Sequence, residues 1–157
     1  MKTTKKIGIL ILGGLLVAQF FQPEQNLGNY ETVAGFLAET KATPEIETVL
    51  KKACFDCHSN STNYPWYSKI TPVNYWMASH VKDGKKHLNF SDWSNYSLKR
   101  KEHKMDEVHE EVEEKHMPIT SYTITHGDAK LTDEEIKLIV DWGKQAQAEY
   151  KQQLGKE

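Results

Sequence analysis

Two cysteines and a histidine stand together in the segment Cys54-Phe55-Asp56-Cys57-His58, and the chain of 157 residues holds no other cysteine. In a helical turn, the two sulfur atoms point to the same side within roughly 60°, and a histidine four residues after the first cysteine lies close by. Both thiols can then bond one edge of a porphyrin while the imidazole reaches its iron. The C-x-x-C-H spacing predicts one covalent haem c, with Cys54 and Cys57 as thioethers and His58 as the proximal iron ligand.

Three other roles compete for the same cysteines. A thiol–disulfide couple needs a strand-to-helix setting and an exposed first cysteine of low pKa, and the sequence around Cys54 predicts neither. A structural zinc site needs two more ligands, and histidines such as His80 and His87 stand at spacings unlike those of zinc fingers. A disulfide across two residues would be strained and would close a tiny loop. Haem attachment is therefore the favoured interpretation.

Residues 1–21 differ in composition from the rest of the chain. Lys2, Lys5 and Lys6 precede an uncharged apolar run over residues 7–21, which is typical of a secretory signal peptide or a short membrane anchor. No small-x-small triplet follows the run, which favours an uncleaved anchor. Fifteen helical residues extend about 22 Å against roughly 30 Å of hydrocarbon, so spanning would need a thinned bilayer or snorkelling lysines. Either role predicts a periplasmic or extracytoplasmic domain.

Composition and periodicity set the class of the remaining chain. A formal net charge of −2 and a hydrophobic content of 38% predict a globular domain and give no indication of nucleic-acid binding. The composition of residues 22–41, with Pro23, Gly28 and Gly35, predicts a tether that leads into an entry segment. Val33, Phe36 and Leu37 are expected to pack in this segment. Residues 42–157 then form the haem-binding domain.

Helical patterns dominate that domain. The first helix is expected to begin after Thr43 as N-cap and to lead into the cysteine motif. A second helix fits residues 73–87, and a third, strongly charged one fits residues 94–115 and is stopped by Pro118. The last begins at Thr132, with Glu135 completing a capping box. No strand pattern has comparable strength, so the predicted fold class is all-α.

A bound haem needs pocket walls, and aromatic residues are the candidates. Ordinary core packing would bury such side chains equally well. The residues selected for the wall are Trp66, Tyr67, Trp76, Phe90 and Trp93.

The iron also needs a group opposite His58. Met117 is the favoured distal ligand, because Pro118 breaks the helix and lets the thioether reach the far haem face. His80 is the main rival, although a hydrogen-bonded core histidine is the commoner role for a residue on an apolar helix face. His126 and His116 follow it, and an open iron is the third alternative. We expect His103 and His109, in the charged helix, to be solvated.

With these residues in hand, the chain resembles the single-haem c-type cytochromes, and more narrowly the bacterial haem-binding domain family, from about residue 27 to about residue 148. The resemblance rests on Cys54-x-x-Cys57-His58-Ser59-Asn60, Tyr64-Pro65-Trp66-Tyr67, His80-Val81, Leu88-Asn89-Phe90-Ser91 with Trp93, and Met117-Pro118 with Tyr122, His126, Leu131-Thr132, Glu135 and Trp142. The charged stretch between Trp93 and Met117 is longer than in a minimal cytochrome.

The resemblance implies a cytochrome c-like helical fold wrapped around one covalently bound haem, with Met117 opposite His58. It also implies a crossing of the first and last helices, with Gly143 allowing close approach. The two faces that would meet are Ile46, Val49, Leu50 and Ala53 on the first helix and Ile136, Ile139, Val140 and Trp142 on the last. The family is characterised by haem binding and implies no reaction.

Histidine opposite methionine leaves no open coordination position, which predicts one-electron transfer rather than enzyme activity. A small haem peroxidase or oxidant reductase would need an open distal side with His80 or His126 as acid or base. A redox or gas sensor would need a signalling domain, which no pattern here predicts. The expected partners are an unidentified redox protein and, through residues 7–21, a membrane. The basic run 99–101 and the glutamates of residues 107–114 could dock such a protein, although charge runs usually form a solvated face.

Overall fold

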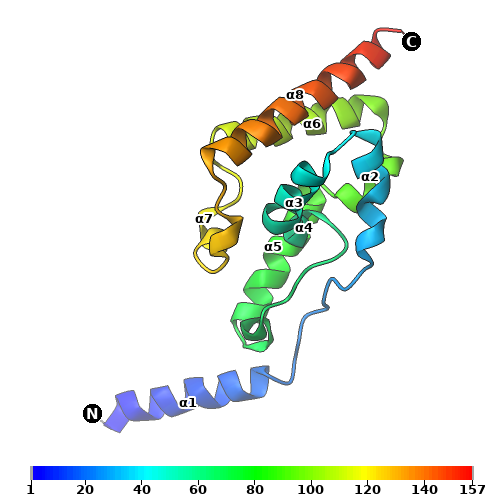
Figure 1. Cartoon of the computed structure of the whole chain (residues 1–157). Helices are drawn as coiled ribbons and strands as arrows, with labels where there is room; N and C mark the ends of the chain where they lie inside the picture. The colour runs from blue at the N-terminus through cyan, green and yellow to red at the C-terminus, as the bar shows by residue number, and fades with distance from the viewer. Residues whose placement is uncertain (1, 157) are drawn as a thin grey trace.

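The computed structural model describes residues 2–156, which hold one isolated bridge, between Leu27 and Ser61, and no strand. The all-α prediction is confirmed. The α-helices are α1 (Lys2–Ala18), α2 (Ala34–Glu39), α3 (Pro44–Ala53), α4 (Phe55–His58), α5 (Val73–His87), α6 (Leu98–Glu113), α7 (Thr120–Thr123) and α8 (Asp133–Leu154). The 3-10 helices are η1 (Tyr30–Val33), η2 (Trp66–Lys69), η3 (Phe90–Asn95) and η4 (Gly127–Ala129). In Figure 1, α8 lies along α6 at one end of the molecule and α1 stands apart at the other.

Capping signals place the helix starts as the sequence predicts. The Thr43 side chain accepts the N–H of Ile46 at the start of α3. Thr132 and Glu135 form a complete capping box at the start of α8. Such caps satisfy backbone N–H groups that have no partner inside the helix. The bounds of α5 agree with the predicted helix over residues 73–87.

The charged stretch forms a shorter helix than predicted. Its first residues belong to η3, and α6 begins after Ser97, whose hydroxyl accepts the N–H of Arg100. At the other end, the N–H groups of Lys115 and His116 donate to carbonyls of the last turn of α6. Lys115 adopts a left-handed φ of 60°, as in a Schellman motif. The helix therefore ends at this motif, ahead of Pro118, rather than at the proline.

Gly143 is a point of close approach between α8 and α6. A Cβ on Gly143 would lie 2.9 Å from the Cβ of His109, so this glycine admits α6 and not α3. The expectation that Gly143 serves a crossing with the first helix is wrong. Because α8 covers it, His109 is only 7% exposed, which corrects the prediction of a solvated side chain. Helix α3 instead meets the start of α8, where Lys52 pairs with Glu135.

The core joins α2, α3, η3, α6 and α8 through buried apolar side chains. The ring centroids of Phe36 and Phe90 lie 4.4 Å apart, and those of Phe36 and Trp93 lie 4.9 Å apart. The Trp93 indole N–H donates to the Tyr150 hydroxyl, and the Trp142 indole N–H donates to the Thr40 carbonyl. These bonds satisfy the polar atoms that burial of a tryptophan would otherwise leave without partners.

Helix α1 lies outside this core. Its apolar side chains are exposed, from 40% for Leu15 to 74% for Leu10. Within residues 2–156, no helix has both the length and the apolar character needed to cross a membrane.

Candidate functional site

The cysteine motif consists of Cys54, which lies between α3 and α4, and of the four residues of α4. Cys54 is the last residue before α4, and its carbonyl accepts the N–H groups of Cys57 at 3.2 Å and His58 at 3.0 Å. Both cysteines are free and half-buried. A single helical turn therefore carries the two thiols and the imidazole.

One bond orients the His58 ring. Its Nδ1 lies 3.1 Å from the carbonyl oxygen of Leu88, which follows α5. A proton on Nδ1 that donates to this carbonyl leaves Nε2 as the atom able to ligate a metal. Burial lowers the pKa of His58, and the Leu88 carbonyl opposes that shift. The ring is therefore neutral at pH 7, which is the form that binds iron.

The environment of the thiols argues against two of the alternative roles. Burial raises the pKa of Cys54 to about 12 and the pKa of Cys57 to about 11. A thiol–disulfide couple needs a cysteine of lowered pKa, because the thiolate is the reactive species. A zinc site needs four converging ligands, and across residues 2–156 no three side chains of His, Cys, Asp or Glu gather in a metal-binding group.

Asp56, between the cysteines, ties the motif to two later segments. Its carboxylate accepts the N–H of Asn63 at 2.9 Å and the hydroxyl of Tyr122 at 2.8 Å. Burial, followed by the charge of Asp56 and this hydrogen bond, raises the pKa of Tyr122. Tyr122 lies in α7, so the bond joins the motif to the loop that carries Met117. The sequence does not single out Asp56, because any residue can fill that position in C-x-x-C-H.

A cavity lies beside Cys57, between α5 and residues 119–126. Its lining includes three aromatic rings, two histidines and a methionine: Tyr67, Trp76, Tyr122, His80, His126 and Met77. Helix α5 approaches the motif closely at Gly84, where a Cβ would lie 2.6 Å from the Cys57 carbonyl oxygen. The close approach of α5 thus brings one wall of the cavity to the motif.

Both cavity histidines have one ring nitrogen bonded to the backbone. His80 Nδ1 lies 2.9 Å from the Trp76 carbonyl, and His126 Nδ1 lies 3.1 Å from the Tyr122 carbonyl. The His126 ring stacks on Tyr122 with centroids 4.1 Å apart, and its Nε2 lies 3.5 Å from the Tyr67 hydroxyl. His80 therefore keeps Nε2 as its available proton carrier or ligand atom, whereas Nε2 of His126 faces the Tyr67 hydroxyl.

The structure brings together only part of the set selected from the sequence. Tyr67, Trp76 and His80 line the cavity. Trp66 is 78% exposed and Trp93 is only 1% exposed, in the core, and neither lines it. Met117 is 37% exposed on the loop between α6 and α7. Its N–H donates to the Glu111 carbonyl. Met117 does not line the cavity, whereas Ile119, two residues further along the same loop, does.

Together these features define an all-helical domain built around a turn that presents two thiols and a neutral imidazole. A model of the haem-binding domain family matches residues 13–145. The chain belongs to this family, and its cofactor is haem. No match was found among curated proteins or among solved structures.

Proposed function

We propose that the chain carries one haem c, bound through thioethers to Cys54 and Cys57 with His58 as the proximal ligand, and passes single electrons. The bond from His58 Nδ1 to the Leu88 carbonyl, at 3.1 Å, carries this proposal. It holds a neutral imidazole with Nε2 available, on the same turn as two free thiols. This donor set fits a c-type haem, since two sulfur atoms and one nitrogen are what its attachment uses.

The protein itself positions the His58 ring and the cysteine turn, and it limits the access of water. The Leu88 carbonyl sets the tautomer and tilt of His58, and Asp56 holds the turn against α7 through Tyr122. When bound, haem would supply an iron that alternates between two oxidation states. Apolar walls such as Trp76 and Met77 would limit access of water and thereby influence the potential.

We propose Met117 as the distal ligand, with His80 as its rival. A thioether favours ferrous iron and raises the potential relative to a second histidine. The Met117 side chain is partly exposed on a loop, so it can reorient without breaking core contacts. His80 already lines the cavity, and that position supports the rival assignment.

A haem peroxidase is the second candidate, and one observation favours it. His80 and His126 both line the cavity beside Cys57, where an acid–base residue would have to lie. This function requires an open coordination position. Carbon monoxide and peroxide binding to the reduced and oxidised protein separate the two candidates, because two strong ligands on the iron would block both.

We propose that the domain works on the extracytoplasmic side of a membrane, attached through residues 7–21, and exchanges electrons with an unidentified redox protein. Two side chains of the basic run 99–101 are engaged within the domain, whereas Lys99 is exposed. Lys101 pairs with Glu39 at 2.8 Å, and the Arg100 guanidinium lies 3.9 Å from the centroid of the Tyr96 ring. The acidic end is partly paired as well, since Glu107 pairs with Lys104 and Glu113 with Lys144. If either end contributes to docking, transfer rates should fall as salt is added.

The test is expression with the cytochrome c maturation machinery, followed by an alkaline pyridine haemochrome spectrum, acid–acetone extraction and intact mass. We expect a mass increase of one haem that acid–acetone cannot remove. Cys54→Ser and Cys57→Ser serve as matched controls, each losing one thioether. A coloured protein that releases its haem to acid–acetone would overturn covalent attachment, and a colourless one would overturn the whole proposal.

The distal ligand is tested by Met117→Ala beside His80→Ala. Met117→Ala should abolish the near-infrared sulfur-to-iron band of the oxidised protein and allow carbon monoxide to bind the reduced one. His80→Ala should leave both properties unchanged. A wild-type protein that lacks this band, and that binds carbon monoxide only when His80 is replaced by alanine, would assign the ligand to His80.

A further inference from the structure

The end of α1 is fastened to the domain by side-chain hydrogen bonds. The Gln19 amide accepts the N–H of Thr71 at 3.0 Å and donates to the Thr71 carbonyl at 3.2 Å. The Gln22 amide oxygen accepts from Asn74 at 2.8 Å. Thr71 and Asn74 are buried, so these bonds satisfy polar groups that would otherwise lack partners. We call Gln19, Gln22, Thr71 and Asn74 the α1 clamp.

The segment after the clamp is held as well. The N–H of Asn26 donates to the Tyr64 hydroxyl at 2.9 Å, and the N–H of Gly28 donates to the Asn60 carbonyl at 2.6 Å. A Cβ on Gly28 would lie 2.4 Å from that same oxygen, so only glycine allows this approach. Residues 22–28 are therefore bonded along the domain and do not form a free tether.

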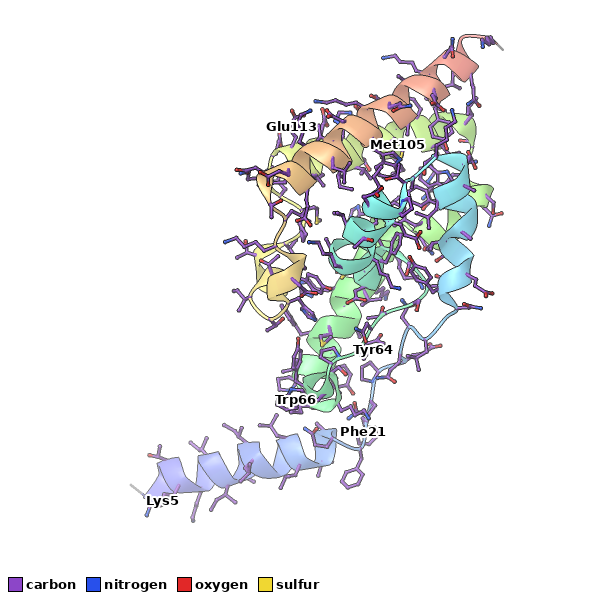
Figure 2. All side chains as sticks on the ribbon, viewed as in Figure 1. Lys5, Phe21, Tyr64, Trp66, Met105 and Glu113 are labelled. Carbon is purple, nitrogen blue, oxygen red and sulfur yellow. The ribbon has the colours of Figure 1, made fainter. Side chains whose placement is uncertain are left out.

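Large apolar side chains surround the clamp and face solvent. The exposed fractions are 87% for Phe20, 65% for Phe21, 78% for Trp66, 44% for Ile70 and 45% for Tyr75. We call these five residues the junction face. Figure 2 shows Phe21 and Trp66 at the end of the domain nearest α1.

One hydrogen bond joins two residues of the junction face, and another joins the clamp to the turn that carries Trp66. The Tyr75 hydroxyl donates to the Phe21 carbonyl at 2.7 Å. Trp66 begins η2, and the carbonyl of Lys69 at the end of this turn lies 3.5 Å from the Gln22 amide. These bonds and the clamp thus fix the backbone of Phe21 and of η2 beside the end of α1.

We propose that the junction face lies in the interfacial layer of a phospholipid bilayer and that the α1 clamp holds the haem-binding domain in one orientation on it. The inference rests on the proposed attachment through residues 7–21. The junction face is continuous with the exposed apolar side chains of α1. A bilayer that covers this helix would therefore also cover the junction face. Tryptophan and tyrosine are enriched at membrane–water interfaces, where an apolar ring and a polar tip are both accommodated.

A fixed orientation has a functional consequence. A domain on a free tether would present every face to a redox partner, whereas a clamped domain presents the same face to each partner that moves along the membrane.

The test uses the full chain in phospholipid nanodiscs, with its four tryptophans replaced by 5-fluorotryptophan. Fluorine NMR spectra are compared with and without a headgroup spin label, and Trp66→Phe assigns the resonance of that residue. We expect the label to remove the Trp66 signal and to spare Trp142, which is 6% exposed and lies in α8. The protein is used with its haem after maturation, and the readout is a tryptophan resonance, so its outcome is independent of whether that haem is covalently attached.

Each outcome decides one part of the inference. A sharp Trp66 signal from protein that coelutes with the nanodiscs would overturn the junction face and leave membrane attachment standing. Protein that does not coelute would overturn attachment, and the inference with it. Gln19→Ala combined with Gln22→Ala should restore the Trp66 signal without releasing the protein, whereas Gln25→Ala, outside the clamp, should not. Loss of the signal in the clamp variant would refute the fixed orientation.

Discussion

Gly84→Ala would test the contact that sets the cavity wall against the turn that carries Cys54, Cys57 and His58. Gly84 lies in the interior of α5, one turn before its end at His87. An added Cβ would lie 2.6 Å from the carbonyl oxygen of Cys57 and 3.1 Å from its Cβ. The oxygen belongs to the backbone and cannot rotate away as the end of a side chain could. The methyl group must therefore push α5 away from α4.

Two opposing effects determine the size of the loss. Alanine in place of glycine in a helix interior stabilises by about 1 kcal/mol. Overpacking costs about 1–3 kcal/mol, and a rigid backbone contact puts this site at the upper end. The net loss is then about 2 kcal/mol, equivalent to a fall in Tm of about 4–8 °C for a domain of this size.

Gly35→Ala is the matched control, because Gly35 lies in the short helix α2 and a Cβ there would meet nothing within 4 Å. It should gain up to about 1 kcal/mol. Urea unfolding followed by far-UV circular dichroism gives both values, and the haem-to-protein ratio after maturation shows whether the displaced α5 also impairs loading. Equal stability of the two variants would refute the argument from the Cys57 contact.

Three further predictions follow from other contacts. Tyr122→Phe removes the 2.8 Å hydrogen bond to Asp56 and should cost about 1.5 kcal/mol. A double-mutant cycle with Asp56→Ala, which leaves no side-chain acceptor, should show coupling, and strictly additive losses would contradict the bond. Lys52, through its hydrogen bond, and the Thr132 backbone hold the pKa of Glu135 below its ordinary value of 4.5. The stabilisation from this shift is complete above pH 4.5 and is lost as pH falls through the folded-state pKa of Glu135. Lys52→Met should therefore flatten the acid limb of the stability profile measured by thermal melts. An unchanged limb would exclude a contribution of the Lys52–Glu135 pair. Met105, which is 0% exposed, should lose about 2–5 kcal/mol on replacement by alanine in the same urea assay, and a smaller loss would mean that the site collapses.

Much of the helical architecture could be predicted from local signals. Thr43 and Thr132 mark helix starts because a side-chain oxygen next to the first turn satisfies backbone N–H groups wherever the helix later packs. The bounds of α5 follow from apolar periodicity. Burial of Val33 and Phe36 agrees with the expected packing, although the helical form of residues 34–39 was not anticipated.

Side-chain environments that depend on distant segments could not be predicted in this way. His109 lies in a run of charged residues that favours a solvated face, yet α8 buries it because Gly143 leaves room for its Cβ. Asp56 acquires its role from Tyr122, 66 residues further along the chain. The Leu88 carbonyl that orients His58 is a backbone atom, which no residue type signals.

The sequence alone determined the donor set of the candidate site, because Cys54, Cys57 and His58 are close in any helical turn, whatever the rest of the chain does. It likewise determined the helical class, since periodicity and caps act over a few residues. Only the tertiary structure decided which carbonyl orients the imidazole, which histidines face the cavity and how α1 is fastened to the domain. Those arrangements depend on contacts between segments tens of residues apart, and the local sequence does not indicate which of these segments will contact each other.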